Sequence, residues 1–270
     1  MFKNYIRVAL RNIGRYKLYS IINILGLAVG IASAIIILLV IQGELQFETH
    51  NENLANIYRI NKKYMMKGVT DINESTPYPL QDALKEIPEI VAATHLTQTP
   101  SILKYEDKVF RETGNVYAAP EIFDIFSFEF VRGSAETAIP DKNSIAISES
   151  IAKKYFGDED PIGKTLINNN RSEVNVTAVF KELPVYTNYN FQIIQNVDKA
   201  VHSEDMDDWY SHWLQTFVLL DESADPVLVE QKIDKLMKSN MEEQSGAVLQ
   251  ALKKIHLYDV DGNPTAQKYI

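Results

Sequence analysis

Few residues in this chain could support metal chemistry, and they are scattered. The sequence has no cysteine and five histidines, so a metal site would need imidazole and carboxylate ligands. The best candidate is an acidic run between His202 and His212, made of Glu204, Asp205, Asp207 and Asp208. No two histidines have the i, i+4 spacing that places both on one helical face. A solvated acidic loop is the better interpretation, and we assign no metal ligand.

Two other short motifs resemble ligand-binding loops without matching them. Residues 259–263 (DVDGN) echo a calcium loop but lack its register and its closing glutamate. Residues 157–165 (GDEDPIGKT) echo a phosphate loop, but five residues separate the glycines where the pattern requires four. Three of those five are acidic, and Pro161 removes an amide donor. We interpret this stretch as an ordinary turn between a helix and a strand.

Catalytic motifs give no better candidate. No serine lies in a Gly-x-Ser-x-Gly elbow, and the lack of cysteine excludes thiol chemistry. A carboxylate pair for acid–base work cannot be singled out among 36 acidic residues. We therefore assign no catalytic, cofactor-binding or metal-binding residue, expect no cofactor, and expect the chain not to be an enzyme.

The elements around these residues are organised by one apolar run, residues 21–41, which contains no charge. About 20 helical residues cross about 30 Å of hydrocarbon, and a helix pairs its own backbone polar groups in lipid. The pattern predicts a transmembrane helix over residues 18–42. Two alternatives stay open: a buried helix of a soluble core, and a signal peptide cleaved after the Ala32-Ser33-Ala34 motif, although cleavage there would cut the apolar run in half.

The flanks of the run predict its orientation. Five basic residues and no acidic residue precede it: Lys3, Arg7, Arg11, Arg15 and Lys17. Glu44, Glu48 and Glu52 follow it. Since short basic segments stay in the cytoplasm, we expect residues 1–17 inside the cell and the remainder outside the inner membrane. The arginines recur every four residues, which predicts a basic amphipathic helix on the inner leaflet.

Charge also limits the partners. The first 17 residues carry five positive charges, so the rest of the chain carries −14 against a total of −9. An acidic body would repel phosphates, which argues against a nucleic-acid partner. The basic leader is better explained by the lipid bilayer, whose inner leaflet is anionic. Within the apolar run, Gly26, Gly30 and Ala34 form a small-residue stripe that either packs against another membrane helix or reflects ordinary composition.

The exported part alternates between strand and helix patterns. Strand patterns cover 57–61, 172–180 and 213–220, and a longer strand-like region with polar turns covers 91–117. An aromatic block at 122–130 is expected to face the core. The order of these elements indicates an α+β fold.

Helix signals mark three places in the same region. Thr76 is expected to cap a helix with Pro77 in its first turn and Leu80, Ala83, Leu84 and Ile87 on its buried face. Ser148 is expected to cap a second helix that ends at Gly157. Asp225 and Pro226 are expected to open a third.

Several of these stretches together resemble the MacB/FtsX-type permeases of ABC transporters, in the form common in Bacteroidetes. The resemblance lies in residues 7–13 (RVALRNI) with 19–31 (YSIINILGLAVGI), in Glu44-Leu45 with 57–60 (IYRI), in 123–133, in 144–157 (SIAISESIAKKYFG) with 160–165 (DPIGKT), and in 255–257 (IHL). Each piece alone is a weak signal. In this order, across nearly the whole chain, they are fairly specific.

The resemblance implies a subunit that performs no chemistry. It implies a cytoplasmic leader (1–17), a membrane helix (18–42), a MacB-like periplasmic core domain (43–260) with a porter-like lobe and a small inserted α/β lobe, and a segment (261–270) that leads towards a missing second membrane helix. The implied partners are a cytoplasmic ABC ATPase, a second permease copy and a periplasmic adaptor protein. A membrane-anchored ligand sensor and a tethered periplasmic enzyme stay open as alternatives.

Overall fold

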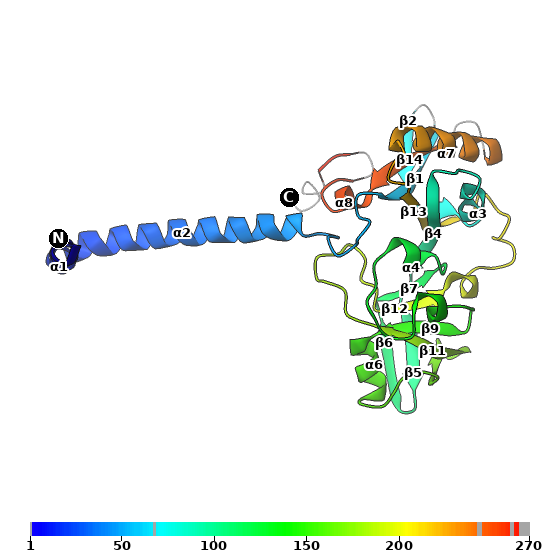
Figure 1. Ribbon diagram of the computed structural model, residues 1–270, viewed down its shortest axis with the longest axis horizontal. Coiled ribbons are helices and arrows are strands. Elements are labelled where there is room, and N and C mark those ends of the chain that lie inside the picture. The colour runs from blue at the N-terminus through cyan, green and yellow to red at the C-terminus, as the bar shows by residue number, and fades with distance from the viewer. Residues whose placement is uncertain (1, 67–68, 242–244, 260–261, 265–270) are drawn as a thin grey trace. The chain divides into compact units, whose positions relative to one another are not determined.

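The computed structural model describes residues 2–66, 69–241, 245–259 and 262–264. The chain divides into two compact units between Gln46 and Phe47. The first unit is helical and the second is built on a mixed sheet (Figure 1). This confirms the predicted α+β class, with one apolar helix followed by a mixed α/β domain.

The first unit consists of helices α1 (Phe2–Arg15) and α2 (Lys17–Leu45). α2 contains the predicted segment 18–42 and is long and apolar enough to cross a membrane, judged by length and composition. Its side chains are almost all exposed within the unit, as expected for a helix whose apolar surface needs lipid or another helix. The Ser33 hydroxyl donates to the Val29 carbonyl at 2.9 Å, which pairs this polar group inside the apolar run.

The second unit begins and ends with one arrangement of strands and helices, here called the first lobe. Its four main strands run in the order β14-β1-β13-β4, each antiparallel to its neighbour, with one helix after β1 and one after β13. This is a split βαββαβ unit. Its elements are β1 (Ile57–Met66), β2 (Val69–Asn73), β3 (Thr76–Pro77), α3 (Leu80–Leu84), β4 (Ile90–Gln98), β13 (His212–Leu220), α7 (Pro226–Asn240), β14 (Ser245–Ala251) and α8 (Leu252–Ile255).

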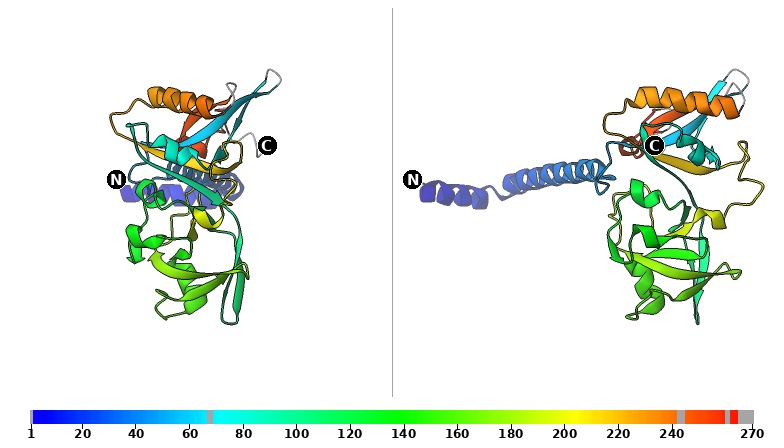
Figure 2. Two further views of the ribbon diagram at one scale, coloured as in Figure 1. Left: turned by 90° about the vertical axis from the view of Figure 1, so that its right-hand side faces the viewer. Right: turned by 45° about the vertical axis from the view of Figure 1, so that its right-hand side comes forward.

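The segment between β4 and β13, residues 99–211, forms an inserted lobe. Its strands continue the same sheet in the order β7-β12-β9-β11-β10-β5-β6, because β7 pairs with β4 of the first lobe. The lobe lies at the opposite end of the domain from α7 (Figures 1 and 2). Its elements are β5 (Ser101–Tyr105), β6 (Lys108–Glu112), β7 (Asn115–Ala118), α4 (Ile122–Ile125), β8 (Phe130–Arg132), α5 (Ala135–Ala138), β9 (Ser144–Ser148), α6 (Glu149–Phe156), β10 (Thr165–Asn168), β11 (Ser172–Phe180), β12 (Ile193–Asn196) and a 3₁₀ turn η1 (Val197–Lys199).

The described residues of this domain form four hydrophobic clusters, three of them large. One lies under α3 and α7, and its buried residues all come from the first lobe, with Leu80 and Ile233 fully buried. Another lies under α6 in the inserted lobe, around Tyr155. The third contains residues of both lobes, including Phe126 and Phe217. The two lobes therefore share one core as well as one sheet.

Most of the predicted elements are present. β11 covers the predicted strand 172–180, and β13 covers 213–220 with one more residue. α7 begins as expected, since the Asp225 carboxylate accepts from the Val227 amide at 2.9 Å. α6 ends at Gly157, whose φ of +66° is the left-handed conformation that glycine adopts without strain. The aromatic block packs against the shared core, as predicted.

One predicted helix cap, Thr76, is wrong, and another, Ser148, is at the predicted N-cap position without a side-chain cap hydrogen bond. Thr76 and Pro77 form strand β3 against β13, and α3 begins at Leu80. The Thr76 hydroxyl donates to the Leu214 carbonyl at 2.9 Å. Pairing with the buried strand β13 therefore gives hydrogen-bond partners to both the backbone and the side chain of Thr76. Ser148 precedes α6 but makes no cap hydrogen bond; the Glu182 carboxylate accepts from the Ser150 amide at 2.8 Å instead.

Candidate functional site: a buried polar network and the domain entrance

The first lobe contains a polar network centred on Arg59 in β1. The side chain is 3% exposed, and its guanidinium lies 2.9 Å from the carboxylate of Glu74, which is 48% exposed. It also donates to the Gln250 side-chain carbonyl at 2.7 Å. Gln215 of β13 donates to the same Glu74 carboxylate at 2.9 Å. A buried guanidinium needs such partners, since an unpaired buried charge is costly.

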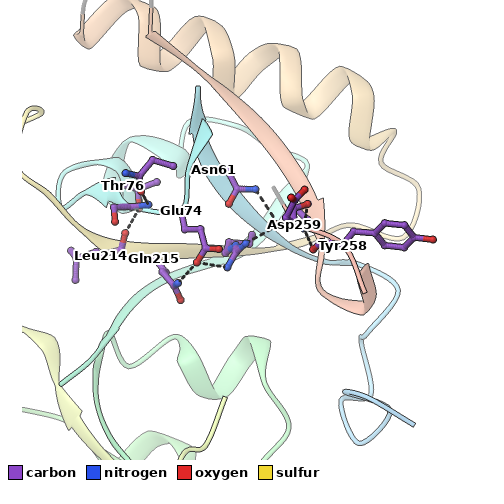
Figure 3. A network of polar contacts seen from close by, with 11 residues as sticks. Asn61, Glu74, Thr76, Leu214, Gln215, Tyr258 and Asp259 are labelled. Atoms are coloured by element: carbon purple, nitrogen blue, oxygen red, sulfur yellow. Dashed lines mark hydrogen bonds and ion pairs between the residues drawn. The ribbon is translucent and has the colours of Figure 1, made fainter. Parts of the chain in front are cut away.

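Gln250 extends the network to the last described part of the chain. Its side-chain amide donates to the carbonyls of Tyr258 and Asp259, both at 3.0 Å. The Asn61 side-chain amide, on β1, donates to the side-chain carbonyl of Gln250 at 3.4 Å. In Figure 3, Glu74 and Gln215 lie on one side of the network, and Tyr258 and Asp259 lie on the other. The network thus connects β1, near the start of the domain, with the segment near its end.

A second anchor lies where the domain begins. Glu48 is 1% exposed and has a φ of +60°, a conformation uncommon for a residue with a side chain. Its carboxylate accepts from the Asn188 amide at 2.6 Å, from Thr187 at 3.1 Å and from Asn51 at 3.0 Å. Backbone and side-chain donors therefore replace the water that this buried charge has lost.

Ring contacts join residues 47–48, here called the entrance of the domain, to the end of the first lobe. The Phe47 ring stacks on His256, which follows α8, and makes an edge contact with Tyr186 at 5.9 Å between centroids. The Glu48 amide donates to the Tyr186 carbonyl at 2.9 Å. The entrance, the 183–189 loop and the 256–259 segment are consequently fixed to one another.

The junction between the lobes contains a small cleft of about 160 Å³. Tyr78 donates to Asp198 across it at 2.8 Å, and Gln81 bridges the His95 amide and Glu121. Burial lowers the pKa of His95 to about 4, against a smaller opposing effect of Asp82. His95 is thus a neutral, buried side chain at neutral pH. The cleft is small for an organic substrate, since ligand pockets usually measure ~300–1,000 Å³.

The acidic run between His202 and His212 is not drawn together into a site. Asp205 accepts from Ser211 and Asp208 accepts from the Tyr210 amide, which are turn contacts. His212 Nε2 lies 2.6 Å from the Lys62 ammonium, and burial together with that cation lowers the pKa of His212 to about 4. Within the described ranges, no group of three histidine, aspartate or glutamate side chains is arranged to hold a metal.

The two loop-like motifs have structural roles where they are described. Residues 157–165 connect α6 to β10, whereas a phosphate loop precedes its helix. Lys164 pairs with Glu159 at 2.5 Å, so the lysine serves a local ion pair. In the 259–263 motif, Asp259 accepts from the Asn263 amide at 2.8 Å, while residues 260 and 261 lie outside the described part of the chain.

The sequence analysis did not predict that Arg59 and Glu48 are buried and hold distant segments together; we call these two residues anchors. The only signal for Arg59 is a charged residue within an otherwise strand-like run, and its partners Glu74 and Gln250 lie 15 and 191 positions further along the chain. Glu48 reads as one acid among three after the apolar run, although Glu52 is exposed and Glu48 is buried. The assignment of no catalytic, cofactor or metal residue stays a prediction.

Comparison with known proteins supplies the family. Residues 20–236 match the model of the MacB-like periplasmic core domain family. Comparison with curated protein sequences gives no match.

Three solved structures share the fold. A permease-protein domain from Porphyromonas gingivalis has a TM-score of 0.66 at 19% identity, covering 74% of this chain and 91% of that one. The periplasmic region of MacB from Actinobacillus actinomycetemcomitans has a TM-score of 0.55 at 17% identity, with coverages of 80% and 93%. The extracellular domain of the noncanonic ABC-type transporter YknZ from Gram-positive bacteria has a TM-score of 0.52 at 14% identity, with coverages of 70% and 99%.

Proposed function

Because this chain belongs to the family of MacB-like periplasmic core domains, we propose that it forms the N-terminal, membrane-anchored part of an ABC transporter permease subunit. The family is a domain of transporter permeases, so the chain is a transporter component. The proposal adds its task. The chain carries conformational change between a cytoplasmic ATPase and the far side of the membrane, and it performs no chemistry itself.

The proposed location is the bacterial inner membrane, with α2 spanning it and α1 on the cytoplasmic side. The basic residues before the apolar run and the acidic residues after it support this orientation. The domain that begins at Phe47 would then lie in the periplasm. The match to a periplasmic domain family is in agreement with that side of the membrane.

One observation supports the coupling role: residues 47–48, at the start of the domain, are held by contacts with distant parts of the same domain. Glu48 comes three residues after α2 ends, and its buried carboxylate holds the loop at 187–188. Phe47 holds His256, and β1 pairs on both sides, with β14 and β13. A displacement applied to the chain at residues 46–48 would therefore reach the first lobe through His256 and the inserted lobe through the 187–188 loop, rather than being lost in a flexible linker.

The partners of this role are a cytoplasmic ABC ATPase and a second permease copy. A periplasmic adaptor protein is a further candidate, and nucleic acid is not. Packing of α2 with a second copy is supported by the small residues Gly26, Gly30 and Ala34, whose spacing of four places them on one face where another helix can approach closely.

Loss of the Glu48 anchor tests the coupling. Glu48→Gln keeps the shape of the side chain but removes the charge that its donors stabilise. We expect the full-length permease, reconstituted in vesicles with the ATPase that copurifies with it, to lose most of its stimulation of ATP hydrolysis. The matched control is Glu52→Gln, an exposed neighbour. Equal ATP hydrolysis by the two variants would contradict the proposal.

Cysteine labelling in intact cells tests the location. The sequence contains no cysteine, so single substitutions give clean signals. Val91→Cys, on an exposed position of β4, should react with a membrane-impermeant maleimide, and Asn4→Cys in α1 should react only after lysis. The reverse pattern would refute the orientation.

The two alternatives predict other results. A membrane-anchored sensor would not copurify with an ABC ATPase. A tethered enzyme would need convergent titratable groups in a pocket of substrate size, and the family gives it no support because its members are permease domains.

A further inference from the structure

Four exposed apolar or aromatic side chains surround the entrance of the domain: Val185, Tyr186, Leu257 and Tyr258. Val185 is 91% exposed, the highest value among the large hydrophobic side chains of the described residues. These residues come from two segments that are far apart in the sequence. We refer to them as the entrance patch.

The contacts at Phe47 bring the two segments together. Tyr186 makes an edge contact with the Phe47 ring, and its carbonyl accepts from the Glu48 amide. His256 also contacts Phe47, since the two rings stack, and it directly precedes Leu257 and Tyr258. The entrance patch is therefore a fixed feature of the domain.

The short stretch of chain between the apolar run of α2 and Phe47 keeps the patch within reach of the bilayer that α2 is proposed to cross. Only residues 42–46 separate the apolar run from Phe47, which corresponds to about 8 Å at about 1.5 Å per helical residue. The polar headgroup layer is about 5–8 Å deep on each side of the hydrocarbon. The length of chain between the apolar run and Phe47 thus matches the depth of the headgroup layer, so residues that contact Phe47 are within reach of that layer.

The chemistry of the patch suits that layer. Tyrosine is enriched at membrane interfaces because its ring is apolar and its hydroxyl is polar. Lys253 and Lys254 are exposed on α8 beside the patch, and the Lys254 carbonyl accepts from the Tyr258 amide at 2.9 Å. Lysine at this height can contact anionic headgroups while its stem covers apolar surface.

We propose that the entrance patch is a second membrane-binding surface, which rests on the outer leaflet of the membrane that α2 crosses and binds lipid headgroups. This inference rests on the proposed function, in which α2 spans the membrane. It adds that the domain touches the lipid surface through Val185, Tyr186, Leu257 and Tyr258. The tilt of the domain would then depend on the lipid as well as on α2.

Spin-label accessibility in the full chain tests this. Single variants Val185→Cys, Val227→Cys and Val29→Cys are labelled with a nitroxide and reconstituted in vesicles of phosphatidylcholine with phosphatidylglycerol. Val227 is the matched control, because it is a valine that is 62% exposed on α7 of the same domain. Val29 lies within α2 and reports the membrane itself.

We expect the ratio of oxygen to nickel-chelate accessibility at position 185 to be severalfold higher than at 227 and to lie between the values at 227 and 29, because headgroup depth is shallower than the middle of the apolar run. Equal ratios at 185 and 227, with a high ratio at 29, would overturn the entrance patch and leave the membrane anchor intact. A low ratio at 29 would overturn the proposed function as well. Low accessibility to both reagents at 185 would indicate contact with protein, such as a second copy, and would also overturn the inference.

Discussion

Among the described residues, each lobe contains one ion pair with a buried member, and the buried members have opposite charges. In the first lobe the buried member is the cation, Arg59, and its carboxylate partner Glu74 is half exposed. In the inserted lobe the buried member is the anion, Glu112, which is 6% exposed and pairs with Lys154 at 2.8 Å. Tyr155 donates a further hydrogen bond to that carboxylate at 2.7 Å.

The difference lies in what each pair connects. Glu112 and Lys154 are 42 positions apart, and they fasten α6 to the neighbouring strand β6. Arg59 and Gln250 are 191 positions apart, and Gln250 continues to Tyr258 and Asp259. The first contact stabilises one lobe locally. The second connects the beginning of the domain to its end. Transmission of movement through the domain requires such a long-range connection, whereas stabilisation of a single lobe does not.

The largest expected effect comes from removing the packing that the two lobes share. Phe217 of β13 contacts the rings of Phe126 and Tyr189, both in the inserted lobe, at 5.3 Å. Phe217→Ala should lower the free energy of unfolding by about 3–5 kcal/mol. Urea unfolding measures this loss, with the exposed Val227→Ala as control. Hydrogen exchange should rise in β11 as well as in β13; a rise in the first lobe alone would show that the lobes are independent.

Removal of the buried cation comes next. Arg59→Ala should cost about 2–4 kcal/mol, because it removes a buried charged hydrogen bond and leaves the Gln250 side-chain carbonyl with only the 3.4 Å contact from Asn61, while Glu74 can turn to water. Exposed Arg111→Ala in β6 is the control. Hydrogen exchange should rise in β14 and at 258–259. An increase that is equally large in the inserted lobe would contradict the role of this network in the first lobe.

Acid should weaken the junction between the lobes through His95. Its folded-state pKa of about 4 lies below the ordinary value of 6.5, so the unfolded chain takes up a proton first as the pH falls. Stability from this group is therefore complete above pH 6.5 and declines towards pH 4, by at most about 1.4 kcal/mol per pH unit.

The measurement is the difference in unfolding free energy between the native chain and His95→Gln as a function of pH. That difference should change between pH 6.5 and 4 and be constant above this window. His212, whose pKa is also lowered, is present in both proteins and cancels. Exposed His202→Gln is the control, and an identical pH profile for the two variants would rule out His95 as the titrating group.

The smallest effect is expected for the buried anion. Glu112→Gln should cost about 1 kcal/mol, since the amide still accepts from Tyr155 and Lys154 is exposed enough to be solvated. Thermal unfolding with Glu173→Gln as control measures it. A loss larger than that of Arg59→Ala would reverse the comparison between the two pairs.

Local signals made much of the fold predictable. β11, α7 and the Gly157 stop follow from alternation, from an Asx-Pro start and from a left-handed glycine, each of which depends on a few neighbouring residues. Thr76 shows the limit of such reasoning. Its sequence context is that of a helix cap, but pairing with β13, about 140 positions away, determines its conformation.

The sequence by itself determined the apolar helix, the charge asymmetry around it and the order of strands and helices, because these depend on composition and on short-range periodicity. Tertiary structure alone decided that Arg59 and Glu48 are buried anchors, that Phe47 meets His256, and that the two lobes share a sheet and a core. The reason is physical: whether a charged or aromatic side chain is buried depends on partners brought together from distant parts of the chain, and a single sequence does not specify which distant residues will meet.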